Sequence, residues 1–205
     1  ASGSKGAVLG GVTTVFEMPN TDPPTTTAEA IADKVKRATG RMWTDFAFYV
    51  GESPENAAQL KDLEREPGCC GIKMFMGSST GSLLVADDEN VARVLASGSR
   101  RVTVHSEDDD RLKERNSLVS GGADVSQHPV WRDVETAVRC TNRLLGLAHK
   151  ASRRVHVLHV TTAEEMEILK DHKDIATVEV LPQHLTLAAP ECYERLGTLA
   201  QMNPP

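Results

Sequence analysis

Short apolar segments of strand length alternate with helical patterns along almost the whole chain. Near-continuous apolar strands joined by helix-length connections are typical of a parallel sheet covered by helices. The pattern predicts strands at 12–18, 46–50, 70–76, 101–105, 155–160 and 177–181. It predicts helices at 27–39, 54–65, 87–96, 129–150, 163–170 and 190–195, a polar stretch at 106–127 and an irregular tail after 182.

A sheet of this kind can stay open, as in doubly wound folds, or close into a (β/α) barrel. No GxGxxG follows the first predicted strand, so the usual dinucleotide-binding signature is absent. A complete barrel has eight strands in about 250 residues, whereas this chain has 205 residues and six predicted strands. We therefore predict one domain over 1–205, an α/β parallel barrel that lacks its first strand and its last two. The missing initial Met agrees with a chain that begins inside a longer reading frame.

Composition argues against several classes of protein. The net charge is −6 with both signs mixed along the chain, so no basic stripe marks a nucleic-acid partner. No apolar stretch approaches the about 18 residues of a membrane span, and residues 1–5 lack the apolar run of a signal peptide. The four cysteines show no CxxC spacing, which favours reduced thiols in a cytoplasmic protein.

Side chains able to bind metal occur near the carboxyl ends of three predicted strands, where parallel α/β folds hold their sites. Lys73 lies in the third strand, His105 ends the fourth and His159 lies near the end of the fifth. Imidazole suits zinc, and a catalytic zinc keeps one position for water, so His105 and His159 are candidate ligands. A single strand-end histidine is more often bonded to nearby backbone, and the convergence of three strands is what favours a site.

Lys73 is unusual because a lysine in an apolar strand is costly unless its charge is paired or neutralised. Either it extends to the surface or its pKa is lowered, so that it acts as a neutral amine. His156 lies three residues before His159, so in a strand it faces the opposite way, and we expect it to pack against a helix. Three histidines in predicted loops or helices are expected to be ordinary surface residues: His128, His149 and His172.

Six segments together resemble consecutive blocks of the dihydroorotase branch of the cyclic amidohydrolases, and allantoinases and hydantoinases share several of them. The blocks are GGVTTVFEMPNT (10–21), GCCGIKMFMGSSTG (68–81), VTVHSEDDDRL (102–112), RVHVLHVTTAEE (154–165), VEVLPQHLTL (178–187) and AQMNPP (200–205). They cover nearly the whole chain in the family's order. The resemblance implies a TIM-barrel metal-dependent hydrolase with two zinc ions.

The resemblance also implies roles for individual residues. The lysine matching Lys73 becomes an N-carboxylated bridge between the zinc ions, although some dihydroorotases use an aspartate instead. The histidines matching His105 and His159 bind the second metal. The asparagines matching Asn20 and Asn203 contact the substrate, Asn20 at its carboxylate and Asn203 at its ring. Two residues of the loop after Lys73 could line the pocket: Ser78 and Thr80.

The sequence departs from the family pattern in three places. The family's His-x-His pair and arginine, at the end of its first strand, have no counterpart before position 12. The last metal ligand, an aspartate that also carries the proton, would follow the MNPP block and thus lie beyond Pro205, so no catalytic residue is identified within the chain. Gln183 stands where many dihydroorotases have histidine, which loosens the substrate assignment.

The activity implied for the intact enzyme is reversible conversion of dihydroorotate and water to N-carbamoyl-L-aspartate, a step of pyrimidine biosynthesis. The 205-residue chain alone is expected to be inactive because it holds only part of the site. Two alternatives stay open: an allantoinase or hydantoinase, and a non-catalytic barrel that acts as a scaffold. The expected partner is a small-molecule substrate, and a homo-oligomer is compatible with the sequence.

Overall fold

A computed structural model of the chain describes residues 2–53, 55–77 and 83–205. Six parallel strands form one sheet in sequence order, with every neighbouring pair parallel. The strands are β1 (Thr14–Glu17), β2 (Asp45–Gly51), β3 (Cys69–Phe75), β4 (Val102–His105), β5 (Val155–Val157) and β6 (Ala176–Val178). The predicted order of strands is therefore observed, although β1, β5 and β6 are shorter than the predicted segments.

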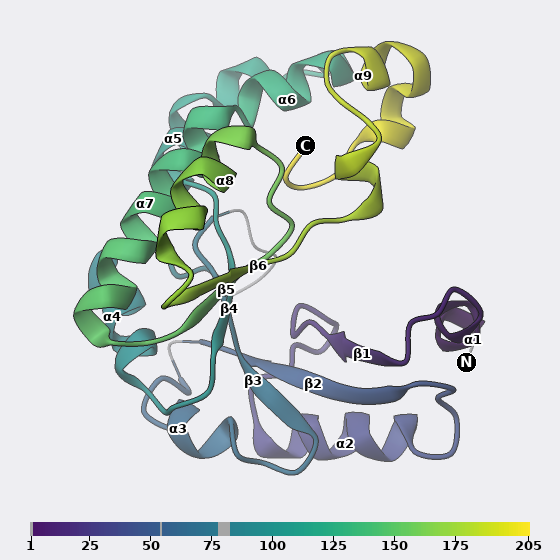
Figure 1. Ribbon diagram of the computed structural model, residues 1–205, viewed down its shortest axis with the longest axis vertical. Helices are drawn as coiled ribbons and strands as arrows, with labels where there is room; N and C mark the ends of the chain where they lie inside the picture. The colour runs from purple at the N-terminus through teal and green to yellow at the C-terminus, as the bar shows by residue number, and fades with distance from the viewer. Residues whose placement is uncertain (1, 54, 78–82) are drawn as a thin grey trace.

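The sheet is strongly curved, with helices along its outer side and an open inner side (Figure 1). The outer helices are α2 (Ala28–Ala38), α4 (Asp88–Ala96), α7 (Val134–Ala151) and α8 (Ala163–Leu169). Their apolar faces pack on the outward-facing strand residues, and the shared core includes Ile31, Ile72, Met74, Val91, Val104, Leu144 and Val157. The core thus lies between sheet and helices, which leaves the inner face for polar side chains.

Alternation along the strands decides which side chains reach the inner face. Val102 and Val104 of β4 belong to the helix-side core. Thr103 and His105, one position removed, therefore point to the other face. Lys73 is the register partner of Thr103, and Phe75 is the partner of His105. The sheet therefore sets Lys73 and His105 on the same inner face of adjacent strands.

Several short helices lie outside the predicted pattern. The polar stretch after β4 contains α5 (Asp109–Glu114) and two 3-10 turns at Asn116–Leu118 and Val125–Gln127. An additional helix, α1 (Ser2–Leu9), precedes β1, whereas the short helix predicted at 190–195 is observed as α9 (Glu191–Leu196). The helix predicted at 54–65 is reduced to α3 (Leu60–Leu63). No helix among the described residues is both long and apolar enough to span a lipid bilayer.

The helix predicted at 129–150 is two helices, α6 (His128–Trp131) and α7. Arg132 leaves helical geometry with ψ 66°. Asp133 then caps α7, because its carboxylate accepts from the backbone N–H of Thr136 at 3.0 Å. Arg111 of α5 also donates to Asp133, at 2.8 and 2.5 Å. The break turns Arg132 inward, where it is 4% exposed and contacts Glu107.

A buried ion pair holds the amino ends of β4 and β5. Glu64, which follows α3, is fully buried and accepts from the backbone N–H groups of Ser99 and Arg100. Arg153, two residues before β5, donates to Glu64 at 3.0 Å. Breaking such a pair leaves a charge buried without its partner, which destabilises strongly. Glu64 therefore fastens one end of the sheet, away from the carboxyl ends of the strands.

We predict that the Asp133 cap can be separated from its ion pair by two substitutions. Asp133→Ala removes both interactions and lowers the free energy of unfolding by about 1 kcal/mol or more. Asp133→Asn keeps an oxygen able to cap α7, because asparagine is as good an N-cap as aspartate, and loses less. Urea denaturation monitored by circular dichroism measures both changes. Equal losses in the two variants would contradict a capping role.

The stability contributed by Asp133 also depends on pH. Partial burial raises the pKa of its carboxyl, but hydrogen bonds from Arg111 and Thr136 outweigh this and lower the pKa to about 2. A depressed carboxyl pKa stabilises the fold fully above the unfolded value of about 3.9 and less as the pH falls toward the folded value. The stability difference between the parent chain and Asp133→Asn should therefore shrink when denaturation is repeated below about pH 4. A difference that stays constant there would contradict this ionisation.

Candidate active site at the carboxyl ends of the strands

Lys73, His105 and His159 come together on the inner face. Lys73 lies in β3, His105 is the last residue of β4, and His159 follows β5 by two residues. The Nδ1 atom of His105 lies 3.0 Å from the Nε2 atom of His159, with the two rings at 72°. The Lys73 Nζ atom lies 4.0 Å from the centre of the Phe75 ring, and that ring centre lies 6.2 Å from the centre of the His105 ring, so the amine belongs to the same cluster.

His159 owes its direction to an irregular backbone. β5 ends at Val157, and His159 has a positive φ of 37°. Such a conformation is uncommon for a residue other than glycine, and strained residues of this kind cluster at functional sites. The regular alternation assumed from sequence therefore does not extend to His159, and its ring turns toward His105.

The prediction that His156 packs against a helix is wrong. It lies in β5 opposite Thr103 and Thr177, and its Nδ1 atom is 2.8 Å from the Thr177 hydroxyl. It also lines an inner-face cavity of about 500 Å³ together with Tyr49 and Glu179. His156 is inward by the alternation of β5, and the bend before His159 brings both histidines to the inner face.

Lys73 is held in an apolar setting. Its side chain is 2% exposed, so it does not extend to the surface. Its Nζ donates to the carbonyl of Met74 at 3.1 Å and lies 4.0 Å from the centre of the Phe75 ring. No carboxylate of the described residues forms an ion pair with it. Burial lowers the pKa of the Lys73 amine well below its usual value, so the neutral amine is favoured.

A carboxylate behind His105 determines which of its nitrogens faces the cluster. Glu107 is buried and its Oε2 atom lies 2.7 Å from Nε2 of His105. Since a carboxylate accepts, Nε2 carries the proton and Nδ1 keeps its lone pair. Arg132 donates to the same Glu107 oxygen and neutralises its charge. Neither residue was singled out from the sequence, and Arg132 lay within a predicted helix.

Both histidines of the cluster are kept neutral. Burial lowers the pKa of His105, partly opposed by Glu107. Burial is the main cause that lowers the pKa of His159, to about 3. A histidine must be neutral to bind a metal ion, so the lowered pKa values of His105 and His159 suit them as metal ligands. Nδ1 of His159 is buried and makes no hydrogen bond within the described part of the chain.

The donor set fits a transition-metal ion. Two neutral imidazole nitrogens face each other at 3.0 Å beside a buried neutral amine. The hydrogen bond from His105 to Glu107 is the second-layer contact that ligating histidines usually make. Lys73, His105 and His159 are thus the residues that could hold a metal, as their positions in sequence predict.

Glu179, just after β6, was not singled out from the sequence. Its Oε1 atom accepts from the backbone N–H of His159 at 3.2 Å. It also raises the pKa of Lys73 against the larger effect of burial. A carboxylate inside the otherwise apolar strand predicted at 177–181 was the signal that could have found it. Glu179 brings a negative charge to the cluster without pairing directly with the lysine.

The two predicted substrate asparagines lie apart from the histidine pair. Asn20 follows β1 at its carboxyl end and is exposed. Asn203, in the tail, is exposed and its Oδ1 atom lies 2.9 Å from Nε2 of His128. Within the described residues, neither asparagine forms a hydrogen bond with Lys73, His105 or His159. Ser78 and Thr80 lie outside the described residues.

The prediction that His128 is a surface residue is wrong. It is 3% exposed, and its Nδ1 atom lies 2.8 Å from the Tyr193 hydroxyl. With Nε2 donating to Asn203, Nδ1 accepts from Tyr193. These contacts join α6 to α9 and to the tail. His128 is the first residue of the four-residue helix α6, which is too short to give a periodic pattern that would reveal its burial.

Two further cavities occur in the described structure, one beside the cluster and one on the helix side of the sheet. One of about 620 Å³ lies between α6, the start of α7 and the tail after residue 182, and its lining includes Glu107, Arg132, His184 and Met202. Both ring nitrogens of His184 lack a hydrogen bond to the described residues, and His184 lowers the pKa of His159. This cavity adjoins the cluster through Glu107 and is lined by unpaired nitrogen atoms of His184.

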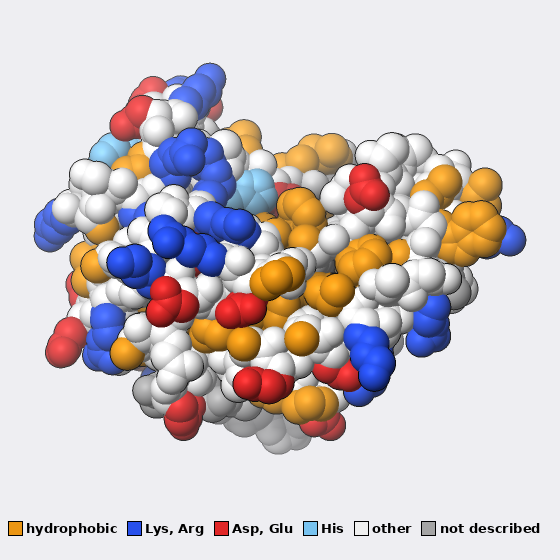
Figure 2. All heavy atoms as spheres, turned by 90° about the horizontal axis from the view of Figure 1, so that it is seen from below, with side chains coloured by type: hydrophobic (Ala, Val, Ile, Leu, Met, Phe, Trp, Pro, Cys, Tyr) orange, Lys and Arg blue, Asp and Glu red, His pale blue; other side chains and the backbone are white. Residues whose placement is uncertain are grey.

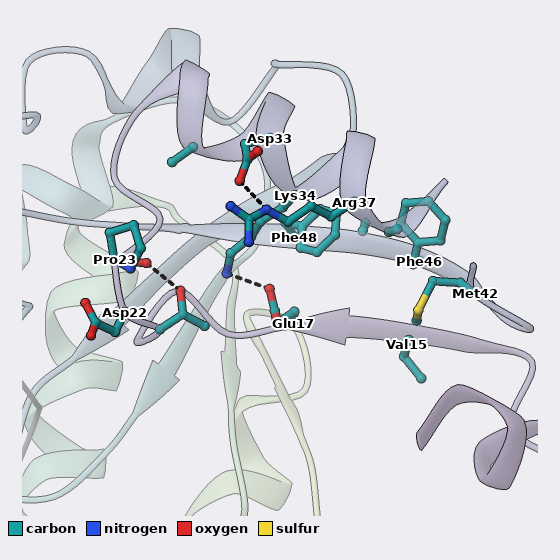
Figure 3. A pocket seen from close by; sticks show the side chains of 14 residues that line it. Val15, Glu17, Asp22, Pro23, Asp33, Lys34, Arg37, Met42, Phe46 and Phe48 are labelled. Carbon is teal, nitrogen blue, oxygen red and sulfur yellow. Dashed lines mark hydrogen bonds and ion pairs between the residues drawn. The ribbon is translucent and has the colours of Figure 1, made fainter. Parts of the chain in front are cut away.

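The other cavity, of about 360 Å³, lies between β1, β2 and α2 (Figure 3). Its apolar residues include Val15, Phe46 and Phe48, and Lys34 pairs with Glu17 across it at 2.5 Å. Hydrophobic side chains also gather across the middle of the face seen from below (Figure 2). No histidine or cysteine lines this cavity, so it offers no counterpart to the metal-binding cluster.

Known proteins with similar sequences match nearly the whole chain. L-hydantoinase of Paenarthrobacter aurescens is 30% identical over 212 residues, which cover 98% of this chain and 46% of that protein. Dihydroorotase of Methanosarcina acetivorans is 31% identical over 216 residues, covering 100% and 46%. Allantoinase of Salmonella gallinarum is 32% identical over 222 residues, covering 100% and 48%. The chain is a homologue of these cyclic amidohydrolases.

The solved structure of L-hydantoinase from Arthrobacter aurescens superposes on the chain with a TM-score of 0.87 at 28% identity, covering 98% of this chain and 46% of that one. A D-hydantoinase structure gives 0.79 at 25% identity. The likeness confirms the predicted fold, an incomplete (β/α) barrel of the cyclic amidohydrolases. No protein-family model matches the chain. The chain spans about half the length of the curated relatives it matches.

We predict that Glu107→Gln weakens metal binding by the cluster. The amide cannot supply the negative charge that fixes the His105 tautomer and neutralises Arg132, and loss of such a contact typically lowers metal affinity about 10- to 100-fold. Competition with a chromophoric chelator measures the affinity. Asp110→Asn, at an exposed carboxylate three residues along, is the matched control and should bind normally. Unchanged affinity in folded Glu107→Gln would contradict the role of Glu107.

Proposed function

We propose that the protein containing this chain is a zinc-dependent hydrolase of cyclic amides, and that the inner-face cluster is part of its active site. The observation that carries the proposal is the 3.0 Å contact between ring nitrogens of His105 and His159 beside the buried amine of Lys73. Their position at the carboxyl ends of parallel strands is where barrel enzymes hold catalytic groups. Homology to three kinds of cyclic amidohydrolase supports the reaction class.

In this proposal Nδ1 of His105, Nε2 of His159 and the modified side chain of Lys73 would hold zinc. When bound, zinc would supply a Lewis acid and water with a lowered pKa. The neutral Lys73 amine can attack carbon dioxide, forming an N–C bond and releasing a proton, which yields an anionic carbamate. The carbamate would give Lys73 anionic oxygen atoms that can bind a metal ion, in place of a buried amine.

The other residues of the chain position these groups. Glu107 holds the His105 ring with Nδ1 toward the cluster, and Arg132 compensates the Glu107 charge. Asn20 and Asn203 are proposed to contact the substrate, since amides can donate to a carboxylate and pair with a ring amide. His128 holds Asn203 by a hydrogen bond, which makes it a positioning residue for that contact.

We propose that residues outside the chain complete the site and the barrel. β1 and β6 each have one neighbour in the described sheet, so both edges carry unpaired backbone groups. A first strand before β1 and two strands after β6 would cover those edges and the open inner face. The remaining metal ligands and the proton-carrying aspartate would come from these segments, so the 205 residues alone are proposed to be inactive.

Dihydroorotate is the first substrate to test, with pyrimidine biosynthesis as the setting and the cytoplasm as the location. Hydantoins are the second candidate, because the L-hydantoinase structure superposes well and Gln183 replaces the histidine that many dihydroorotases have. Hydrolysis of dihydroorotate, hydantoins and allantoin by the full-length protein decides between them. Turnover of hydantoins or allantoin without dihydroorotate would overturn the first choice.

Substitution of the cluster tests the function itself. Lys73→Ala and His159→Asn in the full-length protein should lower kcat/KM by about 100-fold or more, since a metal contributes several kcal/mol of transition-state stabilisation. Lys36→Ala, at an exposed lysine of α2, is the matched control and should retain activity. A full-length protein that binds no zinc and hydrolyses none of these amides would instead favour a non-catalytic scaffold.

A further inference from the structure

A second histidine pair lies at the other end of the sheet. His149 is in the last turn of α7, and His172 ends the 3-10 turn Lys170–His172, which precedes β6. The Nε2 atom of His149 lies 2.9 Å from Nδ1 of His172, with ring centres 5.1 Å apart. A carboxylate oxygen of Asp174 completes a group whose three ligand atoms lie within 4.8 Å of one another.

This group is separate from the candidate active site. The last turn of α7 leads into β5, and the 170–174 segment leads into β6, so the group lies at the amino ends of those strands. His105 and His159 lie at the carboxyl ends. His149 and Asp174 are exposed and His172 is half-buried, so an ion could reach the group from solvent.

The backbone around the group is well anchored. Ala148, next to His149, is fully buried, and the backbone N–H of Arg153 donates to its carbonyl at 3.0 Å. Ile175 is buried, and its N–H donates to the carbonyl of His172 at 3.1 Å, which closes a tight turn around Asp174. The two segments that carry the ligands are therefore held in place before any ion binds.

We propose that His149, His172 and Asp174 bind a divalent transition-metal ion, such as Zn²⁺ or Ni²⁺, at a structural site. This site lies at the amino ends of β5 and β6, here called the lower rim of the sheet. Two imidazoles and a carboxylate suit these ions, with water completing the coordination. Nitrogens bound to one tetrahedral zinc at about 2.0–2.1 Å lie about 3.3 Å apart, so a small ring rotation from 2.9 Å admits the ion. The same facing of ring nitrogens occurs between His105 and His159.

A bound ion would join the end of α7 to the turn before β6. Ions that bind the folded state alone raise its stability in proportion to their concentration and affinity. The site lies at the rim that stabilises a barrel rather than at the rim that carries catalysis. The ion is therefore expected to raise thermal stability and to leave hydrolysis unchanged.

Equilibrium dialysis against Zn²⁺ or Ni²⁺, followed by metal analysis, tests the site in the full-length protein. His149→Asn and Asp174→Asn should each bind one ion fewer per chain than the parent, and should lose the rise in melting temperature that the added ion produces. Asp171→Asn is the matched control, because its exposed carboxylate lies in the same turn but outside the group. It should behave like the parent.

A second variant separates this site from the active site. His105→Asn should still take up the ion at the lower rim, and His149→Asn should keep the parent's activity. The same ion count in the parent, His149→Asn and Asp174→Asn would overturn the proposal, as would a melting temperature that the ion raises equally in all three. Asp174 is exposed and asparagine has nearly the same shape, so Asp174→Asn should fold normally. It therefore tests the site even if His149→Asn folds poorly.

Discussion

The burial of the Lys73 amine in β3 is the constraint on which the candidate site depends. An ammonium without an ion-pair partner is costly in an apolar strand, and burial here lowers the pKa of Lys73 well below its usual value. The fold tolerates this residue as a neutral amine, which is also a form able to react. A charged lysine at this point would repel any cation held by His105 and His159, whereas a neutral or carboxylated one would not.

A chain of contacts extends from this cluster into the helices. His159 faces His105, His105 is held by Glu107, and Glu107 is shared with Arg132. Arg132 reaches inward because Asp133 stops the preceding turn and starts α7. A helix cap on the outer side of the sheet thus supports the orientation of a ring on the inner side. The arrangement is characteristic of sites in which the supporting layer matters as much as the ligands.

The strands could be predicted from the sequence because each one is buried against helices and is therefore a short run of apolar residues. The sequence also singled out Lys73, His105 and His159, which the structure brings together. From the sequence, His156 was misplaced because regular side-chain alternation was assumed through residue 160. β5 instead ends at Val157 and His159 has a positive φ, so His156 and His159 both face inward. The sequence missed Arg132 and the burial of His128, since both depend on long-range partners, Glu107 and Tyr193, that no local pattern reveals.

The central claim is that His105, His159 and Lys73 form part of a metal site in a cyclic amide hydrolase. X-ray diffraction at the zinc absorption edge, from crystals of the full-length protein grown with zinc, tests it most directly. The account predicts an anomalous peak bonded to Nδ1 of His105 and Nε2 of His159, with density extending from Nζ of Lys73 toward it. The claim would be contradicted if no peak occurred there and the two imidazoles kept their direct hydrogen bond.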